Sequence, residues 1–293
     1  MNIADSDMHS ASNVSIEPIG SADGGSDVRA VATDLDGTLL RSDGTVSDRT
    51  RDAVLGVEDL GLRVVIATGR PPRWIAPIVE QLGERGLVVC ANGAAVYDPG
   101  RHELVRRTEL APAVLVELVG ELLDAFPHAV IGVEQGFDFA ADESIRGLPS
   151  PGGEGWDVPG LQIGPIRDFL EVGALKLIVR LPGAAPGISQ AVASVVGPRG
   201  AVTHSVDETF LEISHPQVHK AAAVESLLID SGIAAGEVVA FGDMPNDLEL
   251  LRWAGRGVAV ANAHPSLLGV ADEVTASNDD DGVAMVLERL LLS

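Results

Sequence analysis

The sequence predicts an α/β protein whose core is a doubly wound parallel sheet, with an α+β cap domain inserted between two segments of that core. Short, continuous apolar runs alternate with helix-like segments near both ends of the chain, which is typical of parallel strands covered by helices on both faces. The middle of the chain differs, because a long helical pattern is followed there by several strand-like runs. Gly and Pro residues separate this middle part from the flanking parts, as expected of an insert.

The composition agrees with a globular protein and excludes several classes of partner. The 293 residues suffice for about two domains, and 46% hydrophobic residues exclude a wholly disordered chain. The chain has 43 acidic and 20 basic residues, so its formal net charge is −23. A field of that sign repels phosphate backbones and anionic lipids, so binding to nucleic acid or to a membrane surface is disfavoured. An anionic substrate therefore needs a local cation or metal.

The cysteine content and the N-terminus favour a cytoplasmic protein. Cys90 is the single cysteine and lies in an apolar run, so we interpret it as a small core residue, and an internal disulfide is excluded. The first residues show no secretory signal, and the longest uncharged stretch, 181–198, holds three Pro and three Gly, which is unlike a membrane span. The aromatic fraction of 3% carries no signal for an oligomeric state.

The first core segment is expected over residues 28–107. It follows residues 1–27, which are rich in Ser, Asp and Gly and are predicted to form a flexible tail. Within this segment Ser47 is the expected N-cap of the first helix, and Pro71-Pro72 is expected to open the second. The expected strands are 28–33, 62–67 and 87–90, and the expected helices are 49–60 and 71–82.

The cap is expected over residues 108–214 and the second core segment over residues 215–293. The cap contains a Pro- and Gly-rich stretch at 148–160, which is predicted to be a loop. The expected cap strands are 129–133, 175–181, 201–206 and 210–214, and the expected cap helices are 110–126 and 188–196. In the second core segment the expected strands are 238–241 and 257–260, and the expected helices are 221–229, 246–254 and 282–292.

Two carboxylates follow the first expected strand, in the string Asp34-Leu35-Asp36-Gly37-Thr38. After an apolar run such groups are costly unless they are paired, protonated or bound to a metal. Asp34 could act as a nucleophile or metal ligand and Asp36 as a general acid and base, while Thr38 offers a hydroxyl that could hold a carboxylate. An Asx-turn that ends the strand is the structural alternative.

Two further stretches could bind a phosphate. Thr68 and Gly69 follow the second expected strand and could offer a hydroxyl and a main-chain amide to a phosphate oxygen; an ordinary turn or N-cap is the alternative. Lys220, one of only two lysines, opens an expected helix. Its ammonium suits a phosphate and an aspartate together, whereas a solvated surface lysine is the alternative.

The last stretch follows the strand expected at 238–241. Asp243 stands at the tip of this strand and is a natural Mg²⁺ ligand, while Asn246 and Asp247 begin a helix, where capping is the alternative role. Mg²⁺ prefers few carboxylates together with water and phosphate oxygens, which fits one ion shared by Asp34 and Asp243. Since ligands bind at the carboxyl ends of strands in open α/β sheets, we expect all these groups to converge.

Together the four stretches resemble the haloacid dehalogenase-like superfamily, and more narrowly its Cof-type phosphatases, which carry a large α/β cap. The resemblance covers nearly the whole chain from residue 28 and includes residues 91–94 and 277–283. It implies a Rossmann-like core with a class IIB cap. His219 and Ala221 differ from the family pattern, which often has a small residue before the motif lysine and Gly after it.

The resemblance also implies a role for each candidate residue. Asp34 is implied to be phosphorylated, and Asp36 to shuttle the proton. Thr68, Lys220 and Asn246 are implied to hold the phosphoryl group. The implied metal ligands are Asp34, the main-chain carbonyl of Asp36, and Asp243, with Asp247 steadying Lys220 or the metal waters.

We therefore expect a Mg²⁺-dependent phosphatase that acts on a small phosphorylated metabolite, such as a sugar phosphate or a phosphorylated cofactor. The expected intermediate is an aspartyl-phosphate. A sugar phosphomutase is an alternative, to be separated by comparing isomer formation with phosphate release. A dehalogenase is disfavoured by Asp36 and the acids suited to Mg²⁺. A catalytically silent phospho-ligand binding protein is the alternative outside the enzymes.

Overall fold

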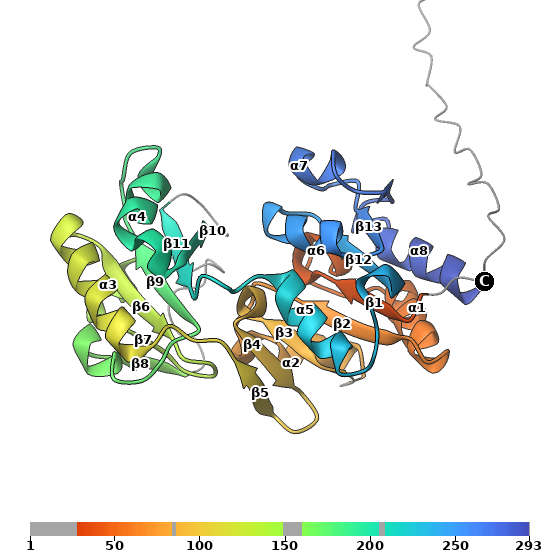
Figure 1. Cartoon of the computed structure of the whole chain (residues 1–293), viewed down its shortest axis with the longest axis horizontal. Helices are drawn as coiled ribbons and strands as arrows, with labels where there is room; N and C mark the ends of the chain where they lie inside the picture. Colours follow the sequence, from red (N-terminus) through yellow and green to blue (C-terminus); the bar gives the residue numbers. More distant parts are fainter. Residues whose placement is uncertain (1–27, 84–85, 149–159, 205–208, 293) are drawn as a thin grey trace, which may run out of the picture.

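The computed structural model describes residues 28–83, 86–148, 160–204 and 209–292. Within them the chain forms two sheets with their own helices, one built from both ends of the chain and one from its middle (Figure 1). The expected tail at 1–27 and most of the expected loop at 148–160 lie outside the described residues. In the described part no helix is both long enough and apolar enough to cross a membrane.

The larger sheet has eight strands in the order β14-β13-β12-β1-β2-β3-β4-β5. The strands from β14 to β3 pair in parallel, whereas β4 and β5 form an antiparallel hairpin at one edge. The strand bounds are β1 Ala30–Thr33, β2 Arg63–Ala67, β3 Val88–Cys90, β4 Ala95–Asp98, β5 Glu103–Arg107, β12 Val238–Gly242, β13 Arg256–Ala259 and β14 Glu273–Val274.

Helices cover both faces of this sheet, which makes its strands nearly continuous apolar runs. On one face Val31, Val239 and Phe241 pack against α1, α2 and α8, and on the other Ala30 and Ala240 pack against α5 and α6. The helix bounds are α1 Asp48–Asp59, α2 Ala76–Gln81, α5 Lys220–Ile229, α6 Leu248–Trp253, α7 Pro265–Leu268 and α8 Gly282–Leu291.

The smaller sheet has six strands in the order β10-β11-β9-β6-β7-β8. Helices α3 and α4 cover one face, where Leu118 and Val192 pack against Val133, Val179 and other apolar strand residues. The opposite face carries Glu134, Lys176 and Glu212 at alternate strand positions. The bounds are α3 Pro112–Ala125, β6 Val130–Glu134, β7 Phe139–Ala141, β8 Leu161–Ile163, β9 Lys176–Arg180, α4 Ile188–Val196, β10 Ala201–His204 and β11 Phe210–Ser214.

The predicted fold class is confirmed, because strands run outward from β1 in both directions and helices lie on both sheet faces. We propose the domain limits of 28–107, 108–214 and 215–293 from the sequence, with the six-stranded sheet as the body of the cap. Ser47 caps α1 as expected, since its side chain accepts a hydrogen bond from the Thr50 amide. Cys90 is fully buried in the core, also as expected.

Two expectations about helices need correction. The single helix expected over 71–82 is divided into a 3₁₀ turn, Pro72–Trp74, and α2. Pro77 has no amide hydrogen to donate to the carbonyl four residues earlier, so a continuous helix would lose that bond. The helix expected over 246–254 likewise begins as a 3₁₀ turn, Pro245–Asp247, before α6.

Candidate active site

The candidate site lies where the strand order of the larger sheet reverses. β1 pairs on one side with β2 and on the other with β12, so the chain leaves β1 and β12 at the same edge, side by side. Thr33 pairs with Phe241, which places Asp34 and Asp243 just beyond this edge. A reversal of strand order in an open α/β sheet creates a ligand-binding crevice.

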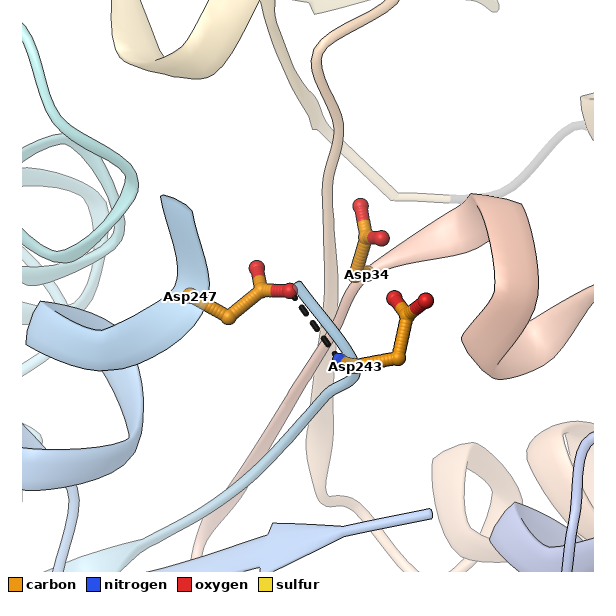
Figure 2. A group of neighbouring side chains, drawn as sticks. All are labelled: Asp34, Asp243 and Asp247. Carbon is orange, nitrogen blue, oxygen red and sulfur yellow. Dashed lines mark hydrogen bonds between the residues drawn. The ribbon is translucent and has the colours of Figure 1, made fainter. Parts of the chain in front are cut away.

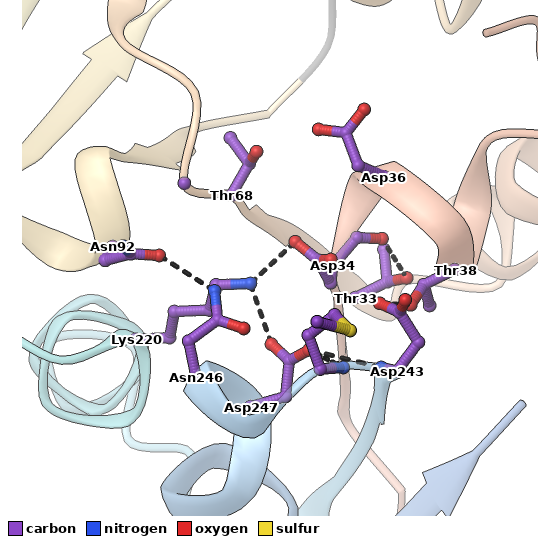
Figure 3. A network of polar contacts seen from close by, with 12 residues as sticks. Thr33, Asp34, Asp36, Thr38, Thr68, Asn92, Lys220, Asp243, Asn246 and Asp247 are labelled. Carbon is purple, nitrogen blue, oxygen red and sulfur yellow. Dashed lines mark hydrogen bonds and ion pairs between the residues drawn. The ribbon is translucent and has the colours of Figure 1, made fainter. Parts of the chain in front are cut away.

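Three carboxylates and one ammonium meet at this edge. One carboxylate oxygen from each of Asp34, Asp243 and Asp247 lies within 4.8 Å of the others. Figure 2 shows the three side chains next to one another. Lys220 Nζ donates to Asp34 Oδ1 at 2.6 Å and to Asp247 Oδ1 at 2.7 Å (Figure 3). All four side chains are buried.

Asp247 serves the site as an anchor. Its Oδ1 accepts from Lys220, and its Oδ2 accepts from the main-chain amides of Asp243 and Met244, each at 3.2 Å. The hydroxyl of Thr38 donates to Asp243 Oδ1 at 2.9 Å. Both oxygens of Asp247 are thus engaged by the protein, which leaves Asp34 and Asp243 as the carboxylates with capacity for a cation.

Burial and mutual repulsion disturb the acid–base balance of this group. Burial raises the pKa of Asp34 well above its ordinary value, although the Lys220 ammonium opposes the shift. Burial, together with the charge of Asp247, raises the pKa of Asp243 to about 6. Burial alone would lower the pKa of Lys220, but Asp247 and Asp34 outweigh it and raise that pKa above its ordinary value. The lysine is therefore a permanent cation.

The donor set fits Mg²⁺. Asp34 and Asp243 offer hard carboxylate oxygens close to each other, and burial raises the pKa of both, so a bound cation would stabilise their ionised forms. Gly37, with φ +75°, lies against this pair, since a Cβ atom there would stand 2.4 Å from Asp243 Oδ2. Position 37 in the turn after β1 therefore requires glycine, because any side chain there would displace the carboxylate of Asp243.

A second polar cluster lines the site from the loop after β2. Thr68 is fully buried, and its Oγ1 accepts from the Arg70 amide at 3.1 Å, so the hydroxyl hydrogen is directed elsewhere. Asn246 donates to Asn92 Oδ1 at 3.1 Å, and the main-chain carbonyl of Thr68 accepts from the Asn92 amide. Thr68, Asn246 and Lys220 thus surround one space next to Asp34 (Figure 3).

Asp36 stands apart from the acid group. Its carboxylate is turned away from Asp34 and Asp243, on the side where Thr68 lies (Figure 3). Arg70 binds it through two hydrogen bonds, Nε to Oδ2 at 2.8 Å and a terminal nitrogen to Oδ1 at 2.5 Å. The side chain of Asp36 is 54% exposed, in contrast to the buried Asp34.

His219 explains how the helix with Lys220 tolerates its departure from the family pattern. The imidazole Nδ1 accepts from the Ala222 amide at 3.2 Å, so His219 is the N-cap of α5. Its carbonyl packs against Gly93, where a Cβ atom would lie 2.7 Å away, and Gly93 has φ +110°. The imidazole is exposed, so its bulk before the lysine is accommodated, while Gly93 allows the close approach of the His219 carbonyl.

Several buried charges near the two sheets were not predicted from the sequence. Lys176 of β9 donates to the carbonyl of Gly69 at 3.0 Å and to Glu212 at 2.9 Å. Arg73, after β2, forms a buried ion pair with Glu134 of β6. Burial raises the pKa of Glu134 to about 7, although the arginine opposes this shift. The scarcity of lysine in the chain was the available signal for Lys176.

Comparison with known proteins identifies the family. The sequence pattern of the haloacid dehalogenase-like hydrolases matches residues 31–137 and 188–287, which is more than half of the chain. The chain belongs to this haloacid dehalogenase-like hydrolase family. The family expected from the sequence motifs is therefore confirmed, and so is the expected enzyme class, the phosphoric monoester hydrolases.

Relatives of this hydrolase match it along most of their length. A phosphatase of Bacillus subtilis is 30% identical, with 90% of this chain and 100% of the relative covered. A 5-amino-6-(5-phospho-D-ribitylamino)uracil phosphatase of the same organism is 28% identical, covering 88% and 96%. The crystal structure of a haloacid dehalogenase-like hydrolase from Bacteroides thetaiotaomicron superimposes with a TM-score of 0.76 at 27% identity, covering 90% and 99%.

Proposed function

We propose that this hydrolase is a Mg²⁺-dependent phosphatase that cleaves small phosphomonoesters through an aspartyl-phosphate on Asp34. The observation that carries the proposal is the position of Lys220, which is fully buried between Asp34 and Asp247. Phosphoryl transfer spreads negative charge over the three equatorial oxygens of the phosphoryl group. A permanent positive charge beside a carboxylate, at the point where the strand order reverses, is suited to stabilise that charge. A merely structural ion pair would not need Thr68 and Asn246 around the same space.

Each side chain of the site has its own role in the proposed reaction. Asp34 attacks phosphorus, so that a bond to its carboxylate oxygen forms as the bond to the ester oxygen breaks. Asp36 gives its proton to the departing alkoxide and then takes a proton from the water that attacks the aspartyl-phosphate. Inorganic phosphate leaves and Asp34 returns to a free carboxylate. Lys220, the Thr68 hydroxyl, the Gly69 amide and Asn246 orient the phosphoryl group.

Asp34 and Asp243 would hold the Mg²⁺ ion, with the Asp36 carbonyl as a further ligand. When bound, the ion supplies positive charge against the phosphoryl oxygens. Thr38 fixes one oxygen of Asp243 through its hydroxyl, and Lys220 fixes one oxygen of Asp34, so both carboxylates are held in place beforehand. Such preorganisation reduces the rearrangement that binding requires.

The substrate is proposed to be a soluble phosphorylated metabolite, with sugar phosphates and phosphorylated cofactors as the classes to test first. The six-stranded sheet presents charged side chains toward the loop after β2, so the leaving group is expected to be small and polar. The ribitylaminouracil phosphatase among the relatives adds phosphorylated sugar alcohols to the panel. A cytoplasmic location stays a prediction.

The test is a phosphate-release assay with Mg²⁺ on p-nitrophenyl phosphate and on a panel of sugar, sugar-alcohol and cofactor phosphates, ranked by kcat/KM. We expect Asp34→Asn to reduce turnover to background, and chelation of Mg²⁺ to do the same reversibly. Asp48→Asn is the matched control, because Asp48 has an 88% exposed side chain on α1. Full turnover by Asp34→Asn would refute the proposed mechanism.

A further inference from the structure

We propose that Arg70 is the positioning residue for Asp36, and that it aligns this proton carrier with the phosphate-binding loop. The inference rests on the function proposed above, because it concerns how Asp36 comes to face the leaving group. It assigns to Arg70 an indirect role, exerted through Asp36, and no contact with the phosphoryl group.

The geometry of in-line transfer restricts where the proton donor can stand. The attacking and leaving oxygens lie on opposite sides of phosphorus, so the proton donor has to stand on the side remote from Asp34. Figure 3 shows the Asp36 carboxylate turned away from Asp34 and toward the side of Thr68. Asp36 therefore lies on the side of the site where a leaving oxygen would stand.

Arg70 holds the Asp36 carboxylate on this side of the site. The side chain of Asp36 is 54% exposed, and it leaves the chain in the turn after β1 that also contains Gly37, so neighbouring packing constrains it little. The planar guanidinium of Arg70 meets both carboxylate oxygens, at 2.8 and 2.5 Å. A fork of this kind fixes direction as well as distance, which a single hydrogen bond does not.

Arg70 also belongs to the proposed phosphate-binding loop, which contains Thr68 and Gly69. Its main-chain amide donates to Thr68 Oγ1 at 3.1 Å, so one residue orients the proposed phosphate ligand with its backbone and the proton carrier with its side chain. The loop is held from outside as well, because Lys176 binds the carbonyl of Gly69, in the same peptide group as the Arg70 amide. Any displacement of this peptide moves both groups together.

The experiment is a double-mutant cycle with Arg70→Gln, Asp36→Asn and the double variant, measured on an alkyl phosphate and on p-nitrophenyl phosphate. Nitrophenolate is a stable anion and departs without a proton, so its pre-steady-state burst reports phosphorylation of Asp34 without help from Asp36. For the alkyl phosphate we expect Arg70→Gln to lower kcat by about 10- to 100-fold, part of the usual contribution of acid–base catalysis, with little change in KM. The nitrophenolate burst rate should change far less.

In the Asp36→Asn background, Arg70→Gln should cause no further loss. Arg70→Lys should recover part of kcat, since one charged hydrogen bond remains. The matched control is Arg49→Gln, which breaks a comparable fork to Glu288, at 2.7 and 2.6 Å, between α1 and α8; it should keep wild-type kcat.

Three results would overturn the inference: additive losses in the double variant, a rise in KM at unchanged kcat, or an equal loss on the nitrophenolate burst. Each would mean that Arg70 acts on the substrate directly or only on the fold. Failure of the proposed function has a different signature, namely wild-type turnover by Asp34→Asn.

Discussion

At the scale of residues, the charge of the acid group explains its chemistry. Asp34, Asp243 and Asp247 share a single ammonium, that of Lys220, in the part of the chain that the structure describes. With all three acids ionised, negative charge exceeds positive charge in a buried setting, where Coulomb interactions are strong. Burial is the main cause of the raised pKa values of Asp34 and Asp243, and the neighbouring negative charges add to it.

The first prediction concerns pH and metal. Because folding raises the pKa of Asp243 from 3.8 to about 6, this group stabilises the metal-free protein at low pH, and that stability is lost as the pH rises through about 6. Asp34 shifts in the same direction. Mg²⁺ binds the ionised carboxylates, so the gain in melting temperature with Mg²⁺ over EDTA should be small near pH 4 and large above about pH 6.

Thermal unfolding with Mg²⁺ or EDTA across this pH range provides the measurement. Asp243→Asn should remove most of the gain, whereas Asp48→Asn, with its exposed side chain on α1, should leave it intact. An equal gain near pH 4 and near pH 7 would show that these carboxylates do not bind the ion.

The candidate residues were predictable from the sequence because each follows a strand or opens a helix at the same sheet edge. Asp34 and Asp243 stand directly after apolar strands, and parallel strands bring such positions together. The pairing of Asp36 with Arg70 was not predictable, because it depends on the direction of two side chains rather than on the position of their backbone. The anchoring of Asp247 by two amides likewise depends on the local turn geometry.

At the scale of elements, the turn after β1 sets the second prediction. Gly37→Ala introduces a side chain at φ +75° and places its Cβ 2.4 Å from Asp243 Oδ2. Gly44→Ala is the matched control, since Gly44 has φ +80° and nothing within 4 Å of the added atom. Both variants should lose about 1 kcal/mol or more of stability from backbone strain, but Gly37→Ala alone should also lose phosphatase activity and Mg²⁺ stabilisation.

Urea unfolding and the phosphate-release assay measure these two effects separately. Equal activity in the two variants would mean that Asp243 relaxes around the new methyl group without consequence.

The parallel strands of the larger sheet were predicted well, whereas short strands such as β7 and β8 were missed. The strands β1, β2, β3, β12 and β13 lie close to where the sequence predicts them, because burial on both faces makes most of their residues apolar. The hairpin β4–β5 was missed, since β5 is largely exposed and its sequence is Glu-Leu-Val-Arg-Arg. An edge strand needs no apolar pattern when only its backbone pairs with the sheet.

At the scale of the whole molecule, a buried ion pair joins the six-stranded sheet to the turn that follows β2. Arg73 of this turn lies close to the rings of Trp74 and Phe139, and Glu134 meets it from β6. Both charged side chains are about 95% buried, so removing one partner leaves the other charge without compensation. These contacts hold the proposed cap against the loop that carries Thr68.

The third prediction is that Glu134→Gln weakens this closed arrangement. We expect a loss of about 3–5 kcal/mol in stability, or in its place a larger radius of gyration in solution as the two sheets separate. Unfolding curves and small-angle X-ray scattering distinguish the two results. Glu121→Gln is the control, because the Glu121–Arg199 pair lies at the surface of the six-stranded sheet's helices and should contribute little to stability.

If Glu134→Gln gave the same unfolding curve and the same radius of gyration as Glu121→Gln, the contact between the two sheets would not depend on the Arg73–Glu134 pair. The pair could not be predicted from the sequence, because Arg73 lies in the 3₁₀ turn after β2 and Glu134 in β6, and no local pattern connects them.

The strand order of the larger sheet also has a consequence for synthesis on the ribosome. β1 needs β12 beside it, and the pairing joins Ala30 to Val238, so the nascent chain emerges with its central strand half unpartnered. The six-stranded sheet, by contrast, draws all its strands from the stretch between them and can form first. Asp34 therefore meets Lys220 only after the residues of the six-stranded sheet have been synthesised, so phosphatase activity is expected to appear after that sheet can fold.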